Sequence, residues 1–131
     1  MKQYSYLKSD LSKAKNLGSG ATGSHHWLMQ RLTALLLIPL FIWLVFFSYQ
    51  SSGKDLASIL ALLKKPVNIV AFMLIMLTSL YHSMLGMQVV LEDYISCLKL
   101  RNFFVILLKL FTFVTSFTFL VALIYFLIHN S

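Results

Sequence analysis

The sequence predicts an all-α integral membrane protein, and two observations carry that prediction. Hydrophobic residues make up 59% of the 131 residues and charged residues only 11%, with a mean hydropathy of +0.80, whereas a soluble domain carries roughly 25% charged residues. The chain also contains three long apolar runs. It therefore has too little polar surface to fold as a water-soluble globule and too many apolar residues to be disordered.

The three apolar runs predict three transmembrane helices at residues 32–49, 67–91 and 103–128. A helix that crosses a hydrocarbon core about 30 Å thick needs roughly 20 apolar residues, and each run approaches or exceeds that length. The runs do not alternate polar and apolar residues as the strands of a membrane barrel do. Pro39, within the first run, predicts a kink.

The remaining segments divide the chain into an arm and a membrane domain. Residues 1–24 carry four lysines and end in a Gly/Ser/Thr-rich stretch, which predicts a flexible, basic N-terminal arm. Residues 25–131 form the predicted membrane domain. The first connection contains the apolar segment 56–63, which is too short to span and predicts a helix lying at the interface.

The positive charges are better explained by contact with lipid headgroups and by their role in setting membrane topology than by binding of nucleic acid. Eleven Lys and Arg residues oppose four Asp and Glu residues, giving a net charge of +7, but no basic face alternates with stacking aromatics. Seven of the cations flank the N-terminal side of the first span or lie in the second connection: Lys2, Lys8, Lys13, Lys15, Arg31, Lys99 and Arg101. Lys109 can snorkel to that side. The opposite side has Lys54, Lys64 and Lys65, so the positive-inside rule predicts a cytoplasmic N-terminus, or a matrix one in mitochondria.

His82 is the most informative polar residue, because it lies past the middle of the second span. An imidazole at that depth is costly unless a partner engages it. Position alone leaves two interpretations: a hydrogen bond within the helix bundle, with Thr78, Ser79 and Ser83 nearby, or ligation of haem iron. Gly86 follows on the same helix face, where a missing side chain accommodates either a flat macrocycle or a close helix neighbour.

A second polar group gathers at the predicted cytoplasmic interface. Asp93 and Tyr94 follow His82 by 11–12 residues, roughly 17–18 Å along a helix, and Arg31 begins the first span on the same membrane face. These residue types are ordinary at an interface. A phenol, a carboxylate and a guanidinium together also offer the donors and the acceptor that bind a quinone carbonyl and relay protons.

Three further residues point less specifically to a function: His25, His26 and Cys97. Either histidine of the pair can titrate near neutral pH and serve proton movement, although interfacial polar residues before a span are an ordinary feature. The pair lacks the further ligands of a zinc site. Cys97 is the only cysteine, which excludes an intramolecular disulfide and attachment of c-type haem.

Two stretches then carry a resemblance to a known family. The segment HSMLGMQVVLEDY has the spacing His82-x3-Gly86-Met87-x5-Asp93-Tyr94, and the segment HHWLMQR precedes the first span and ends at Arg31. Together with the three-helix plan, they resemble the D-type hydrophobic membrane anchor subunits of succinate dehydrogenase, respiratory complex II. The resemblance extends from about Gly23 to the end of the chain.

The resemblance implies a set of roles for these residues. The three spans would form half of a haem-binding bundle, with His82 as one axial ligand of haem b and Gly86 packing beside the haem. Tyr94 would line the ubiquinone site with Asp93 beside it. Arg31, at the start of the first span, matches a family arginine near the haem propionates and the quinone site. His25 matches a family histidine in the same region, and its neighbour His26 makes that match ambiguous by one residue.

The resemblance also implies partners. A C-type cytochrome b anchor subunit would supply the second haem ligand, a flavoprotein subunit with FAD would oxidise succinate, and an iron–sulfur subunit would pass electrons to ubiquinone. This chain has no dinucleotide fingerprint and one cysteine, so it would be a non-catalytic subunit in the tricarboxylic acid cycle and respiratory electron transport. An N-terminus without arginine favours a bacterial inner membrane over a mitochondrial one. The alternatives are a haem-free fumarate reductase-type anchor and a small pore-forming or transport-associated protein.

Overall fold

A computed structural model describes residues 20–129, and within that range every element is a helix. The helices are α2 (Gly20–Ser51), α3 (Leu56–Leu63), α4 (Pro66–Tyr94) and α5 (Leu98–His129). The three long helices are apolar enough to cross a membrane, over Ser24–Ser51, Pro66–Tyr94 and Leu98–His129. The prediction of an all-α protein with three spans is therefore confirmed.

The helices extend beyond the apolar runs that predicted them, most of all at the start of α2. This helix begins at Gly20 rather than near residue 32, and its 32 residues measure about 48 Å at 1.5 Å per residue. A hydrocarbon core of about 30 Å needs only part of that length to be apolar, so the polar turns lie outside the predicted run. Residues 1–19 of the predicted basic arm lie outside the described residues, and residues 20–24 belong to α2.

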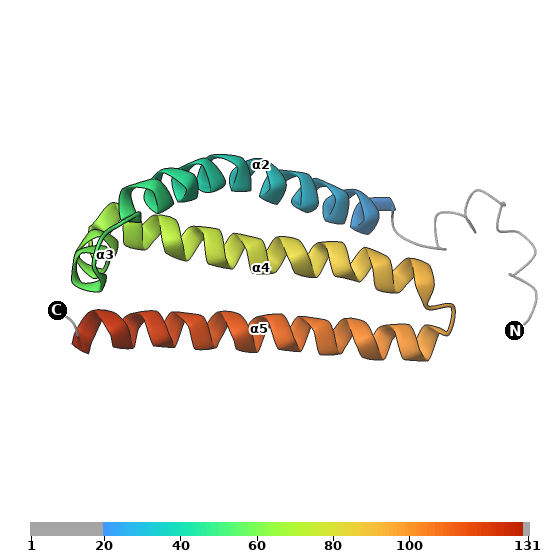
Figure 1. Ribbon diagram of the computed structural model, residues 1–131. Coiled ribbons are helices and arrows are strands. Elements are labelled where there is room, and N and C mark those ends of the chain that lie inside the picture. The colour runs from blue at the N-terminus through green and yellow to red at the C-terminus, as the bar shows by residue number, and fades with distance from the viewer. Residues whose placement is uncertain (1–19, 130–131) are drawn as a thin grey trace, which may run out of the picture.

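The helices run antiparallel, with α4 in the middle (Figure 1). The start of α2 lies at the same end of the molecule as the connection between α4 and α5, while α3 and the end of α5 lie at the other end (Figure 1). This arrangement places Lys99 and Arg101 at the same end as the start of α2, as the orientation argument requires. It places the lysines around α3 at the opposite end.

Helix α2 bows over α4 (Figure 1), and Pro39 lies inside it. Proline has no backbone N–H and its ring clashes with the carbonyl one turn earlier, which bends a helix. Two leucines that bracket the proline, Leu37 and Leu40, are buried and pack against Ile75 of α4. This stretch of α2, on either side of Pro39, therefore packs against α4.

One asparagine joins three helices at the α3 end. The Trp43 indole N–H of α2 donates to Asn68 Oδ1 of α4 over 3.3 Å, and Asn68 Nδ2 donates to the Leu62 carbonyl of α3 over 2.7 Å. Leu62 is also the buried residue of α3. These contacts hold a short helix that, at eight residues, is too short to be stable by itself.

Candidate functional site

His82 lies on α4, is half-buried and faces α2. Its Nδ1 lies 2.8 Å from the Thr33 hydroxyl oxygen. Thr33 also bonds to its own helix, with Oγ1 2.8 Å from the Met29 carbonyl oxygen and 3.0 Å from that of Gln30. The partner of His82 is thus a residue of the first span rather than one of the hydroxyls on its own helix that the sequence placed nearby.

Gly86 faces the same helix one turn further along α4. A Cβ placed on it would lie 3.9 Å from the side-chain nitrogen of Gln30, an ordinary van der Waals distance. The pairs His82–Thr33 and Gly86–Gln30 together define the antiparallel register of α4 on α2. In this chain Gly86 therefore lies beside a glutamine of the neighbouring helix.

Arg31 lies on an exposed face of α2, and its guanidinium carbon lies 4.1 Å from the centre of the Trp27 ring. This is a cation–π contact between residues one helical turn apart. It draws the guanidinium toward the start of α2. By the register above, the Arg31 backbone is level with Leu85, roughly 12 Å along the axis from Asp93.

Asp93 and Tyr94 form the last two positions of α4, at the same end of the molecule as the start of α2. Both side chains are exposed, and Tyr94 retains 85% of its accessible surface. The Ile95 backbone N–H donates to the Leu91 carbonyl and ends the helix. The part of the chain that the structure describes gives the Tyr94 phenol no hydrogen-bond partner.

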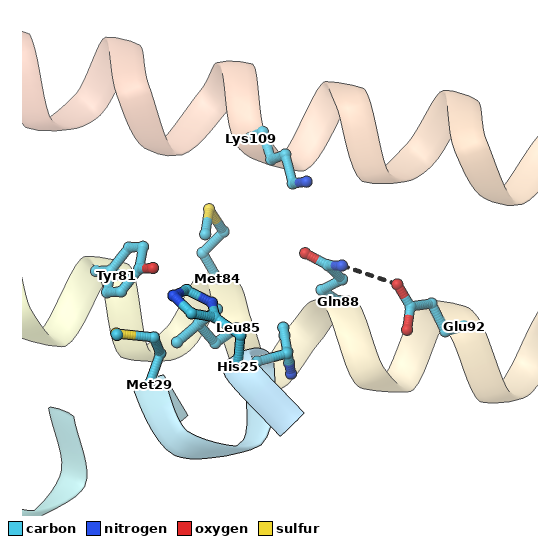
Figure 2. Close-up of a pocket in the computed structure, with 9 residues that line it drawn as sticks. His25, Met29, Tyr81, Met84, Leu85, Gln88, Glu92 and Lys109 are labelled. Carbon is cyan, nitrogen blue, oxygen red and sulfur yellow. Dashed lines mark hydrogen bonds between the residues drawn. The ribbon is translucent and has the colours of Figure 1, made fainter. Parts of the chain in front are cut away.

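A pocket of about 400 Å³ opens near the start of α2, between α2, α4 and α5 (Figure 2). Polar side chains from all three helices line it, and Gln88 donates a hydrogen bond of 2.8 Å to Glu92. The His26 Nε2 atom is buried and has no partner among the described residues. The lining consists of His25, His26, Met29, Tyr81, Met84, Leu85, Gln88, Glu92 and Lys109.

This pocket brings together residues that the sequence did not connect. Lys109 belongs to the third apolar run, yet its side chain extends from α5 toward the space beside Gln88 (Figure 2). Charged side chains at membrane depth face a bundle interior or a wet cavity. The pocket therefore gives Lys109 a polar environment within the chain. It also places His25 and His26 within one polar lining with Glu92.

Metal-binding capacity within the described residues is limited. They contain no group of three or more His, Cys, Asp or Glu side chains that could hold an ion. Among the described residues, a metal at His82 would thus find no set of three such ligands. The donor chemistry at His82 suits ligation of a metal, because the contact with Thr33 occupies Nδ1 and leaves Nε2 unengaged by the described residues.

Comparison with known proteins identifies the family. The "Succinate dehydrogenase/Fumarate reductase transmembrane subunit" family matches residues 6–123. The chain belongs to this family. Relatives from Rickettsia bellii and Rickettsia conorii are 48% and 49% identical to it, over 91% of this chain and 95% of theirs, and both are named "Succinate dehydrogenase hydrophobic membrane anchor subunit". No solved structure matches the chain.

Membership of the succinate dehydrogenase/fumarate reductase transmembrane subunit family confirms the resemblance drawn from the two segments. It agrees with the three apolar helices and with a multi-pass membrane protein. It also confirms that the chain is a subunit of a complex rather than an enzyme by itself. The family match disfavours the alternative of a small pore-forming protein.

Proposed function

We propose that this chain is the hydrophobic membrane anchor subunit of a succinate dehydrogenase, holding the complex on a bacterial inner membrane. The observation that carries the proposal is the match to relatives of that name over 95% of their length. Its partners are a C-type cytochrome b anchor subunit, an iron–sulfur subunit and a flavoprotein subunit with FAD. The complex passes electrons from succinate to ubiquinone, linking the tricarboxylic acid cycle to respiratory electron transport.

We further propose that His82 supplies one axial ligand of haem b. Two features support this: its depth in α4 and its Nε2 atom, which the described residues leave unengaged. When bound, haem b supplies one-electron redox chemistry, and the protein supplies its binding and orientation. With haem b bound, His82 would hold the iron from this chain and the C-type subunit would provide the second ligand. Gly86, which lies beside Gln30 of α2 within this chain, would place no side chain between its helix and the haem.

The ubiquinone site of the proposal lies at the end of α4. Tyr94 donates its phenolic proton to a quinone carbonyl, and the Asp93 carboxylate beside it accepts and passes protons. Arg31 is held by Trp27 with its guanidinium turned toward this end, where it binds a haem propionate or the quinone. His25 lies in the polar pocket behind the site and serves proton movement.

The assignment of His82 is tested by His82→Ala in the four-subunit complex purified in mild detergent. We expect the reduced-minus-oxidised b-type absorbance and the haem content to fall to background, because one of two iron ligands is gone. His129→Ala is the matched control, since this histidine lies at the end of α5 and bonds to the Tyr125 carbonyl. A haem content in His82→Ala equal to that of the parent complex would refute the ligand assignment.

The same purification tests the anchor role. We expect the chain to co-purify with a flavoprotein and an iron–sulfur subunit and to support succinate:ubiquinone reductase activity. A chain that purifies only with copies of itself contradicts the anchor role. A complete complex that contains flavin and iron–sulfur clusters but no haem instead supports the haem-free fumarate reductase-type anchor.

A further inference from the structure

The contact between Thr33 and His82 is a hydrogen bond whose donor can be identified from the other partners of the threonine hydroxyl. A threonine hydroxyl has one proton to donate and two lone pairs to accept with. Thr33 Oγ1 has three polar neighbours: the carbonyl oxygens of Met29 and Gln30 at 2.8 and 3.0 Å, and His82 Nδ1 at 2.8 Å. Because the two carbonyl oxygens only accept, they compete for the single hydroxyl proton.

The distances decide where that proton lies. If the hydroxyl donated to Nδ1, Oγ1 would face two carbonyl oxygens within about 3 Å with no hydrogen between them, which is repulsive. If it donates to its own helix, as threonines within helices commonly do, the single proton is shared between the Met29 and Gln30 carbonyl oxygens, and a lone pair of Oγ1 is free to accept from His82. The hydroxyl then accepts from His82, so the ring proton resides on Nδ1.

We infer that Thr33 is a positioning residue, whose hydroxyl holds His82 in the Nδ1–H tautomer and so presents Nε2 as the metal-binding nitrogen. This inference rests on the proposed haem-ligand role of His82 and names a residue of the first span that supports it. A neutral imidazole protonated on one nitrogen keeps its lone pair on the other. The hydrogen bond also fixes the plane of the ring and raises the basicity of the ligating nitrogen.

The position of Thr33 suits this role. It is half-buried, and its hydroxyl is anchored to the α2 backbone by the bond to Met29. The acceptor therefore has little freedom to leave the ring. No described hydroxyl on α4 performs this function, although Thr78, Ser79 and Ser83 lie within four residues of His82 along the same helix. The support comes from across the helix interface and depends on the register of α2 against α4.

The test compares Thr33→Val, which keeps the shape and removes the hydroxyl, with Thr33→Ser, which keeps the hydroxyl. Both are made in the purified four-subunit complex. Loss of such a support typically weakens metal binding by about 10- to 100-fold, so we expect haem transfer from Thr33→Val to excess apomyoglobin to quicken by about that factor. The midpoint potential of the haem should rise, because a less basic ligand stabilises the ferric state less. Thr33→Ser should restore both values.

Thr112→Val is the matched control. Thr112 on α5 makes the same type of bond to its own helix, 2.9 Å to the Leu108 carbonyl, so it reports the effect of removing such a bond elsewhere in the bundle. We expect it to leave the haem potential and the transfer rate unchanged. If Thr33→Val does not assemble, Thr33→Cys provides the measurement: its sulfur is a weak acceptor, and both values should shift in the same direction.

The outcomes separate this inference from the proposed function. If His82→Ala loses haem while Thr33→Val matches the parent complex in potential and transfer rate, the positioning role is overturned and the ligand assignment stands. If Thr33→Ser is as impaired as Thr33→Val, packing rather than the hydroxyl is responsible, and the inference is overturned. If His82→Ala keeps its haem, the ligand assignment itself is wrong and the role of Thr33 falls with it.

Discussion

Tyr94 ends α4 with its phenol exposed, at the end of the bundle that also carries Asp93 and the start of α2. A hydroxyl that finds no partner within the described chain is available to a ligand or a neighbouring subunit. Tyr49, at the end of α2, is equally exposed, with 82% of its surface accessible, but lies at the opposite end of the molecule. The two tyrosines therefore form a natural comparison.

We predict that Tyr94→Phe lowers succinate:ubiquinone reductase activity about tenfold, since a lost hydrogen bond of about 1.4 kcal/mol in the transition state corresponds to that factor. Reduction of a soluble dye by succinate should be unchanged, because it bypasses the quinone. Tyr49→Phe should affect neither rate. Equal losses in the quinone and dye assays would argue against a quinone-binding role for Tyr94.

Residue chemistry could be predicted for His82 but not for its partner. An imidazole inside an apolar run is conspicuous at any register, because its cost depends only on depth. Thr33 does not stand out in the sequence, because a threonine hydroxyl in a membrane helix can donate its hydrogen bond to the backbone of its own helix. That the same hydroxyl can also accept a hydrogen bond from His82 becomes visible only when α2 and α4 are aligned. Lys109 and Gln88 were missed as pocket residues for the same reason: their roles depend on helix packing.

At the scale of helices, Asn68 links α2, α3 and α4 where the three helices meet, a place called the corner below. Its side chain accepts from Trp43 and donates to the Leu62 carbonyl. Among the described contacts of α3, this is the side-chain hydrogen bond that fixes the short helix to a long one. Hydrogen bonds between membrane helices contribute about 0.6 kcal/mol each on average, so the corner depends on a small free energy.

We predict that Asn68→Ala speeds amide hydrogen exchange of Leu56–Leu63 about fivefold, corresponding to loss of about 1 kcal/mol from two such bonds. The b-type absorbance should not change, because His82 lies well away from the corner along α4. Asn102→Ala, at an exposed position of α5, serves as the control and should leave the exchange rates as they were. Unaltered exchange in Asn68→Ala would show that Leu62 packing alone holds α3.

The elements themselves were largely predictable, and their ends were not. Apolar composition identified all three spans, and the short segment 56–63 coincides with α3. The start of α2 was missed, because hydropathy reports which residues tolerate lipid and not where backbone hydrogen bonding begins. Polar residues such as His25 and Arg31 continue the helix outside the apolar run. A bend in α2 was predictable from Pro39, because the effect of a proline on its helix is local, and α2 does bow (Figure 1).

At the scale of the whole molecule, the cations divide between the two ends. Arg31, Lys99 and Arg101 lie toward the end that carries the start of α2, whereas Lys54, Lys64 and Lys65 surround α3. Four more lysines precede α2 in the sequence. This asymmetry favours a cytoplasmic start of α2, and Cys97, exposed in the connection between α4 and α5, is the single cysteine that can report it.

We predict that a membrane-impermeant maleimide labels Cys97 in inside-out vesicles and not in intact spheroplasts, with labelling after solubilisation as the reference. A Cys97→Ser/Ser52→Cys variant moves the thiol to the exposed turn between α2 and α3 and should give the reverse pattern. Labelling of Cys97 from outside intact cells would show that the chain has the opposite orientation.

Helix α5 has no buried residue among those that the structure describes, and α2 and α4 have only two each. Lipid can cover the apolar side chains of such a bundle, but it offers no hydrogen bond to the buried His26 nitrogen or to the Lys109 ammonium. A copy left without its complex therefore has little buried core to hold its helices together. We therefore expect orphan copies to be short-lived, so that balanced synthesis of the subunits, rather than supply of this one, limits its abundance.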